Sequence, residues 1–143
     1  MNIFQALRED HERQREMANI LVDTHGDSQA REEAFNILKK ELHDHAKAEE
    51  RHFYLPLIES DLTQEKARHG MAEHHEFDEL VEELEQMDYS SAGWLVKAKH
   101  LSERLHHHLA EEEHEFFQLA GKVFSEKEKV SFAKEFKKER DAL

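Results

Sequence analysis

Apolar residues recur along this chain at helical spacing, in four long segments separated by short polar stretches. The segments cover about residues 2–24, 29 into the fifties, 64–87 and 92–122. In each segment the apolar positions lie three or four residues apart, so they share one face at about 100° per residue. Short connectors join helices that are antiparallel neighbours. The pattern therefore predicts an all-α fold, an up-down-up-down four-helix bundle.

The ends of these segments carry recognisable helix signals. Thr63 is expected to cap the third helix, and Pro56 should kink or end the second because proline removes a backbone donor. Ser125, followed three residues later by Glu128, resembles a capping box and predicts a short fifth helix at about 125–141. Four of its apolar residues could pack across a bundle end: Val130, Phe132, Ala133 and Phe136. No linker divides the chain, so we expect a single domain over 1–143 with its four-helix core at about 1–122.

Polar residues interrupt the apolar faces of all four long segments. His45 and Glu49 lie four residues apart on the inner face of the second, and His108 and Glu112 repeat this spacing in the fourth. The first and third segments each contribute a lone inward histidine. The inner polar residues are thus His11, His45, Glu49, His74, His108 and Glu112.

Composition narrows the chemistry that such residues can perform. The 143 residues include 13 histidines and no cysteine, which excludes disulfides, thiolate ligands and iron–sulfur clusters. A net charge of −13 repels phosphate backbones, so nucleic acid is not an expected partner. No apolar run approaches the roughly 20 residues of a membrane span, and no secretory signal is visible. The cytoplasm is the expected compartment.

Burying six imidazole and carboxylate groups at about the same level of a bundle is costly unless they are paired or bound to metal. Histidine and carboxylate together suit first-row transition metals such as iron, manganese or zinc. Two facing His-x-x-x-Glu helices can hold two metal ions with carboxylates between them. The sequence therefore predicts a metal site in the bundle core.

The pattern resembles the hemerythrin-like family, also called the HHE cation-binding domain. The match rests on Asp10-His11, HAKAEERHFY at 45–54, Glu73-His74 and HHLAEEEHEFF at 107–117. The resemblance implies a non-haem di-iron centre bridged by carboxylates and an oxo or hydroxo group. It implies the same six residues as ligands, and O₂ or peroxide as the small-molecule partner. Oxygen binding, sensing, peroxide chemistry and iron homeostasis all remain possible, and whether the chain is an enzyme stays open, as does any protein partner.

One position departs from the oxygen-carrying members of that family. They have a further histidine four residues before the His74 position, where this chain has Gly70. Either His69 or Glu73 is close enough on the third helix to supply an extra ligand. A metal with fewer protein ligands keeps open coordination positions, which favours redox chemistry over reversible oxygen carriage.

Two alternatives compete with this hypothesis. Ferritin-like di-iron oxidases use Glu-x-x-His on two helices, a spacing met by Glu49 with His52 and by Glu111 with His114. At helical periodicity, however, His114 falls opposite the apolar face. The other alternative is a helical interaction module that binds no metal and uses its histidines to sense pH.

Overall fold

The computed structural model describes residues 1–143 and is entirely helical. The four long helices are α1 (Ile3–Val22), α2 (Gln29–Glu49), α4 (Gln64–Gln86) and α5 (Ala92–Glu111). Each of α2 and α5 continues through a π-helical turn into a shorter helix. These continuations are η1 (Glu50–Tyr54) with α3 (Leu55–Ile58), and η2 (Glu112–Phe116) with α6 (Phe117–Val123). The last helix is α7 (Glu126–Ala142).

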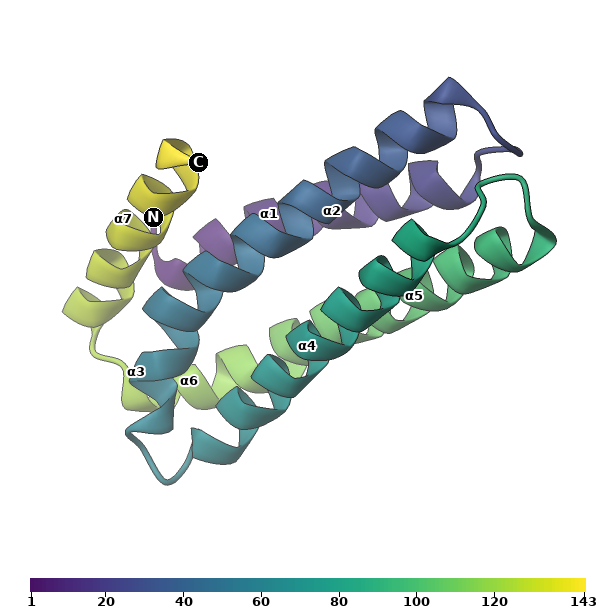
Figure 1. Ribbon diagram of the computed structural model, residues 1–143. Helices are drawn as coiled ribbons and strands as arrows, with labels where there is room; N and C mark the ends of the chain where they lie inside the picture. Colours follow the sequence, from purple (N-terminus) through teal and green to yellow (C-terminus); the bar gives the residue numbers. More distant parts are fainter.

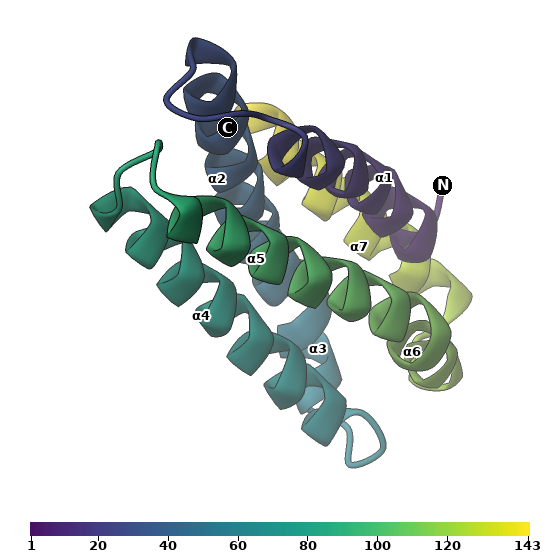
Figure 2. The same cartoon turned by 90° about the vertical axis from the view of Figure 1, so that its right-hand side faces the viewer.

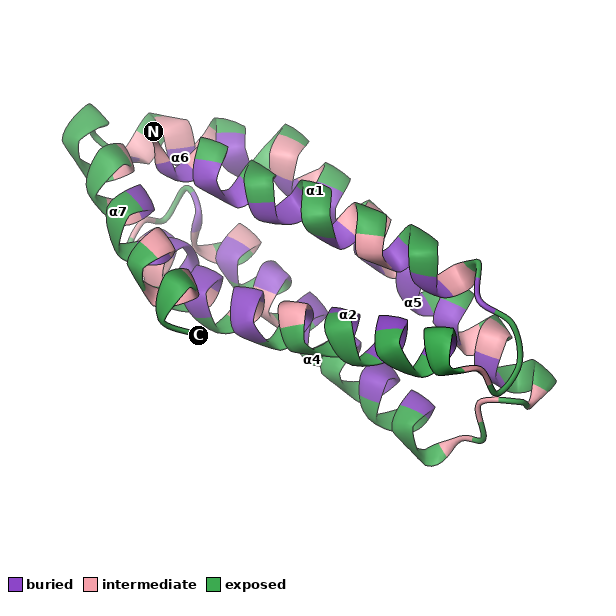
Figure 3. Ribbon diagram, turned by 90° about the horizontal axis from the view of Figure 1, so that it is seen from above, coloured by how far each residue is buried: buried purple, intermediate pink, exposed green.

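The long helices run up, down, up and down, which confirms the predicted bundle (Figure 1). α1 packs against α2 and α5, and α4 packs against α5 and α2, so the four helices enclose one interior. Viewed from another side, α4 and α5 lie side by side along their length (Figure 2). The buried residues form stripes that face the interior, as the apolar periodicity requires (Figure 3).

Side-chain caps fix several of the helix starts. Asn2 and Ser125 both form capping boxes, and Ser28 accepts a hydrogen bond from the backbone N–H of Arg31 at 3.1 Å. Thr63 stands at the N-cap position of α4, but its hydroxyl donates to the Leu57 carbonyl at 2.6 Å instead of capping the helix. The predicted N-cap position of Thr63 is therefore confirmed, but its side chain makes no capping hydrogen bond because that hydroxyl anchors the preceding turn.

The second helix does not end at Pro56. The π-helical turn η1 precedes the proline, and the chain stays helical to Ile58. A proline is tolerated in the first turn of a helical segment, where its missing N–H is not needed. The break in the regular α-helix thus comes at Glu50, six residues before the proline.

The fifth helix packs along α1 as well as against the end of α2. Ala133 and Phe136 are buried, and Phe132 is partly buried. Val130 is 55% exposed, so its predicted packing against the bundle is wrong: it faces solvent from the first turns of α7.

The interior contains two apolar clusters. One surrounds Trp94, Phe35 and Leu84 near the α1–α2 and α4–α5 connections, and the other surrounds Phe53 and Phe116 near α3 and α6. In each long helix, the inward polar residues lie at the sequence boundary between residues of the first cluster and residues of the second. A polar layer therefore crosses the bundle between two hydrophobic clusters. None of the helices is both long and apolar enough to cross a membrane.

Candidate metal centre

Six histidine and glutamate side chains meet in this polar layer, one or two from each long helix. They are the residues that the sequence singled out: His11, His45, Glu49, His74, His108 and Glu112. All six are buried, and both glutamates are completely inaccessible to solvent. The ligand-type atoms of two overlapping groups of three lie within 4.8 Å of one another, and both groups contain Glu49.

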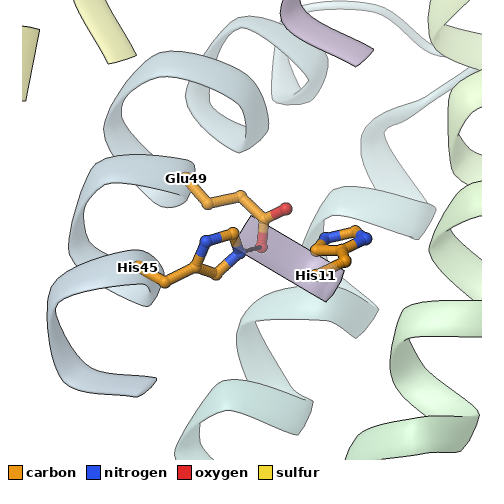
Figure 4. Close-up of side chains that lie close together, drawn as sticks. All are labelled: His11, His45 and Glu49. Carbon is orange, nitrogen blue, oxygen red and sulfur yellow. Dashed lines mark ion pairs between the residues drawn. The ribbon is translucent and has the colours of Figure 1, made fainter. Parts of the chain in front are cut away.

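Glu49 lies between histidines of three helices. Its Oε1 is 3.4 Å from Nε2 of His45 on its own helix and 3.0 Å from Nε2 of His74 on α4. His11 of α1 completes a group with His45 and Glu49, and Figure 4 shows these three side chains converging. One carboxylate thus gathers imidazoles from α1, α2 and α4.

Glu112 occupies the equivalent place on the other side of the layer. Its Oε1 is 3.1 Å from Nε2 of His11, and its Oε2 is 3.5 Å from Nε2 of His108 on its own chain segment. Each glutamate therefore contacts the histidine four residues before it and a histidine of another helix. The twofold repeat in the sequence becomes an approximate twofold repeat in the arrangement of the side chains.

Several atoms at the centre of this layer have no hydrogen-bond partner, because their contacts of 3.0–3.5 Å with one another are not aligned as hydrogen bonds. They are Nε2 of His11, His45 and His108, both carboxylate oxygens of Glu49 and Oε1 of Glu112. A buried polar atom left without a partner costs about 1–3 kcal/mol. Six such atoms aimed at one another in one small region are unusual for a folded protein. Their donor types, imidazole nitrogen and carboxylate oxygen, fit a transition-metal ion.

The other ring nitrogen of each inner histidine binds a second carboxylate. The four pairs are His11 Nδ1 with Glu113 at 2.7 Å, and His45 with Asp10, His74 with Glu50 and His108 with Glu73, each at 2.8 Å. A carboxylate accepts a hydrogen bond, so it favours a proton on Nδ1 and turns Nε2 towards the centre. Metal-binding histidines in proteins typically have such a partner.

Sequence reasoning did not assign this role to the four outer carboxylates. Each of them directly adjoins an inner residue in the chain: Asp10 before His11, Glu50 after Glu49, Glu73 before His74 and Glu113 after Glu112. Consecutive helix residues point about 100° apart, so one faces the centre while its neighbour reaches around the ring of another helix's histidine. The sequence signal for these outer carboxylates was an acidic residue directly before or after an inner histidine or glutamate.

The charges of the layer strongly perturb the ionisation of its members. Burial lowers the pKa of His45, but Glu49 and Asp10 outweigh it and raise that pKa to about 10. Burial also lowers the pKa of His74, but Glu49 and Glu50 outweigh this effect and raise that pKa to about 9. Burial and the neighbouring Glu49 raise the pKa of Glu112 above its usual value. The metal-free layer therefore favours protonated imidazoles, and these protons compete with any cation.

Tyr54 fills the space beside Gly70. A Cβ placed on Gly70 would be 2.5 Å from both Cζ and Oη of the tyrosine. The tyrosine ring is fully buried, stacks on His74 at a centroid distance of 5.3 Å, and its hydroxyl donates to Oε2 of Glu112. The phenol ring of Tyr54, in η1, thus occupies the space that a side chain at position 70 would fill.

A small cavity adjoins the layer on the side of the helix connections. Its walls include His45, His74, His108, Phe77 and Gln14, and its volume is about 10 Å³. That is roughly enough for one water-sized molecule. The side chain of Gln14 is 1% exposed, and its Nε2 has no hydrogen-bond partner. The cavity thus combines three inner imidazoles with an amide donor that no protein group satisfies.

The remaining histidines lie away from the inner layer. Nε2 of His52 donates to a carboxylate oxygen of Glu139 in α7 at 2.9 Å, so His52 points away from the inner residues. His114 is exposed, as expected, so it does not face the bundle core, which removes one half of the ferritin-like pairing. His69 is half exposed and contacts Glu73 and Glu111 on the outer surface.

Comparison with known proteins points to one family. Residues 2–120 match the model of the hemerythrin HHE cation binding domain. Among solved structures, the chain is similar to the crystal structure of a hemerythrin HHE cation binding domain-containing protein from Mycobacterium kansasii. The two share 19% sequence identity over 99% of this chain and 89% of that chain, with a TM-score of 0.85, a likeness of fold. No curated protein matches the sequence significantly.

Proposed function

Because this chain belongs to the hemerythrin HHE cation-binding domain family, we propose that its core binds two non-haem iron ions that react with O₂ or peroxide. The proposed ligands are the six inner residues, His11, His45, Glu49, His74, His108 and Glu112. The observation that carries the proposal is the set of unpartnered nitrogen and oxygen atoms that these side chains direct at one another. Bound iron supplies one-electron redox chemistry and an open coordination position for a small oxygen species.

The protein's own contribution is to orient these ligands. Asp10, Glu50, Glu73 and Glu113 each hold one imidazole by its Nδ1. Such outer partners fix the ring orientation and make the inward nitrogen a better donor. These four carboxylates thus hold the imidazoles with Nε2 turned towards the centre.

The surroundings keep bulk water away from the centre. Phe117 stacks on the His11 ring at 6.0 Å, Phe136 packs on His45 at 5.8 Å and Phe77 on His108 at 5.4 Å. The cavity lined by Gln14 provides room for about one water-sized molecule next to three imidazoles. This combination supports a small ligand such as O₂ or peroxide over an organic substrate.

Metal content of the purified protein, with an absorption spectrum before and after exposure of the reduced form to air, tests the proposal. We expect two irons per chain. A near-ultraviolet and visible band that reverses on removal of oxygen would support carriage or sensing, whereas an irreversible change would support redox chemistry or iron handling. Absence of metal would overturn the di-iron centre in favour of a metal-free interaction module, and zinc without iron would overturn the assignment of iron.

Two histidine variants locate the iron. His108→Ala removes an inner imidazole and should lose iron, while His114→Ala changes an exposed residue one turn beyond Glu111 and should keep it. Circular dichroism should show that both variants remain helical. Loss of iron in His114→Ala with retention in His108→Ala would instead support the ferritin-like arrangement.

A further inference from the structure

A second group of histidines and carboxylates lies on the outer surface of α4 and α5, which run side by side (Figure 2). His69 Nε2 is 3.0 Å from Oε1 of Glu111 and 3.3 Å from Oε1 of Glu73. His107 Nε2 lies 3.1 Å from the other oxygen of Glu111. We propose that His69, Glu73 and Glu111, with His107 beside them, form a surface binding site for a divalent transition-metal ion.

The spacing of the donor atoms fits a metal ion. Zinc lies about 2.0–2.2 Å from nitrogen and oxygen ligands in a tetrahedron. The edges of such a tetrahedron are about 1.6 times that length, roughly 3.3–3.6 Å. The separations from His69 to Glu73 and Glu111 are 3.3 and 3.0 Å, within a few tenths of an ångström of these edges. The donor atoms of all three residues lie within 4.8 Å of one another.

Hydrogen bonds alone do not explain this group well. The Nε2 atom of His69 carries at most one proton, yet it faces two carboxylate oxygens. Glu111 has no lysine or arginine within 4 Å, and its ionic partners are the two histidines His69 and His107. The two carboxylates carry a charge of −2, of which Arg104, 3.4 Å from Oε2 of Glu73, offsets one; a divalent cation would offset the rest.

The chemistry of the donors defines the class of ion. Imidazole with carboxylate suits zinc, iron(II) and similar first-row ions, whereas magnesium and calcium prefer sites made of oxygen alone. The site is also open to incoming ions, because the side chains of His69 and His107 are 51% and 60% exposed. The inner layer, in contrast, is closed to solvent.

A single carboxylate joins this surface site to the inner layer. The same Oε1 of Glu73 that lies near His69 also accepts a hydrogen bond from Nδ1 of His108 at 2.8 Å. The two sites nevertheless use different histidines and different helical faces. Removing an inner ligand on another helix, such as Glu49, therefore leaves all the donor atoms of the surface site in place.

Zinc titration by calorimetry tests the site with a matched control. His69→Ala and Glu111→Gln should each weaken one class of zinc site at least about tenfold relative to the unchanged protein. His75→Ala should not, although His75 also faces a glutamate four residues later, Glu79, at 3.0 Å on the same helix. Equal weakening in His75→Ala, or no weakening in His69→Ala, would overturn the proposal.

Two further measurements separate this site from the inner one. Crystals soaked in zinc should show an anomalous-scattering peak at bonding distance from His69 and Glu111. Zinc peaks elsewhere on the surface, with no peak at His69 and Glu111, would refute the proposed site. The titration repeated in a Glu49→Gln background should retain the surface site. If the inner layer holds no metal at all, that result is unchanged, so failure of the di-iron proposal and failure of this one are distinguishable.

Discussion

Replacing Gly70 with alanine should destabilise the protein, although helices ordinarily prefer alanine. The added Cβ would lie 2.5 Å from Cζ and Oη of Tyr54. Carbon atoms in contact normally lie about 3.5–4.0 Å apart, so the overlap is about 1 Å. The tyrosine cannot swing away easily, because it is fully buried between His74 and Phe116 and donates a hydrogen bond to Glu112.

Two opposing effects set the size of the change. Alanine in place of glycine inside a helix stabilises by about 1 kcal/mol, whereas forcing an additional methyl group into a packed core costs about 1–3 kcal/mol. The fixed ring of Tyr54 favours the upper end of that cost, so we expect a net loss of about 1–2 kcal/mol. Gly121→Ala is the matched control: nothing lies within 4 Å of its added Cβ in α6, and only the gain applies.

Urea unfolding of the metal-free protein, followed by far-ultraviolet circular dichroism, measures both variants. The midpoint should fall for Gly70→Ala and stay or rise for Gly121→Ala, with an unchanged slope. In a Tyr54→Leu background the overlap is gone, so Gly70→Ala should become neutral or stabilising. If Gly70→Ala stabilises the unchanged protein as much as Gly121→Ala does, Tyr54 does not fill the place of the absent histidine.

Four other outcomes follow from the same structure. Asp10→Asn should weaken metal binding about 10–100-fold in a chelator competition while the helices persist, because it loosens His45. Tyr54→Phe should cost about 1.5–3 kcal/mol in urea unfolding, since it removes a hydrogen bond to Glu112, yet keep the metal content unchanged. Gln14→Met should raise the stability of the metal-free protein by about 1 kcal/mol, since it removes an unpartnered buried amide. The pKa of His45 is raised from 6.5 to about 10, so its proton must leave on metal binding. Affinity should therefore rise with pH until the pH reaches that raised pKa of about 10, and calorimetry in buffers of different ionisation enthalpy should detect the released proton.

The inner residues could be found from the sequence because a polar group on an apolar face is conspicuous. His45 and Glu49 stand among leucines and phenylalanines at helical spacing, and His108 and Glu112 repeat the pattern. Short connectors fix antiparallel neighbours, so the levels of the four helices follow from counting residues. The bundle and the meeting of the six side chains therefore follow from local patterns alone.

The outer carboxylates could not be selected in the same way. The chain has 33 acidic residues, and most of them lie on solvated faces where their presence says nothing about a partner. Whether Glu73 or Glu76 reaches His108, 35 residues after Glu73 in the chain, depends on the rotation and separation of α4 and α5. Periodicity shows on which face of its helix a residue lies, but it does not show which residue of a neighbouring helix that face contacts.

The π-helical turns explain the largest departure from the simple periodic pattern. At 100° per residue, Tyr54 lies about 140° around the helix from Glu49 and should point outward, yet it is completely buried. In η1 the Leu55 N–H bonds to the Glu50 carbonyl, five residues back, so the turn contains one extra residue and brings Tyr54 round to the inner face. The same turn after Glu112 brings Phe117 inward. Each turn begins at or directly after an inner glutamate. Before the turn, a histidine and a glutamate face the interior; after it, two aromatic residues do. The wall of the centre, and with it the phenol that occupies the place beside Gly70, thus depends on a backbone irregularity that regular helical spacing does not predict.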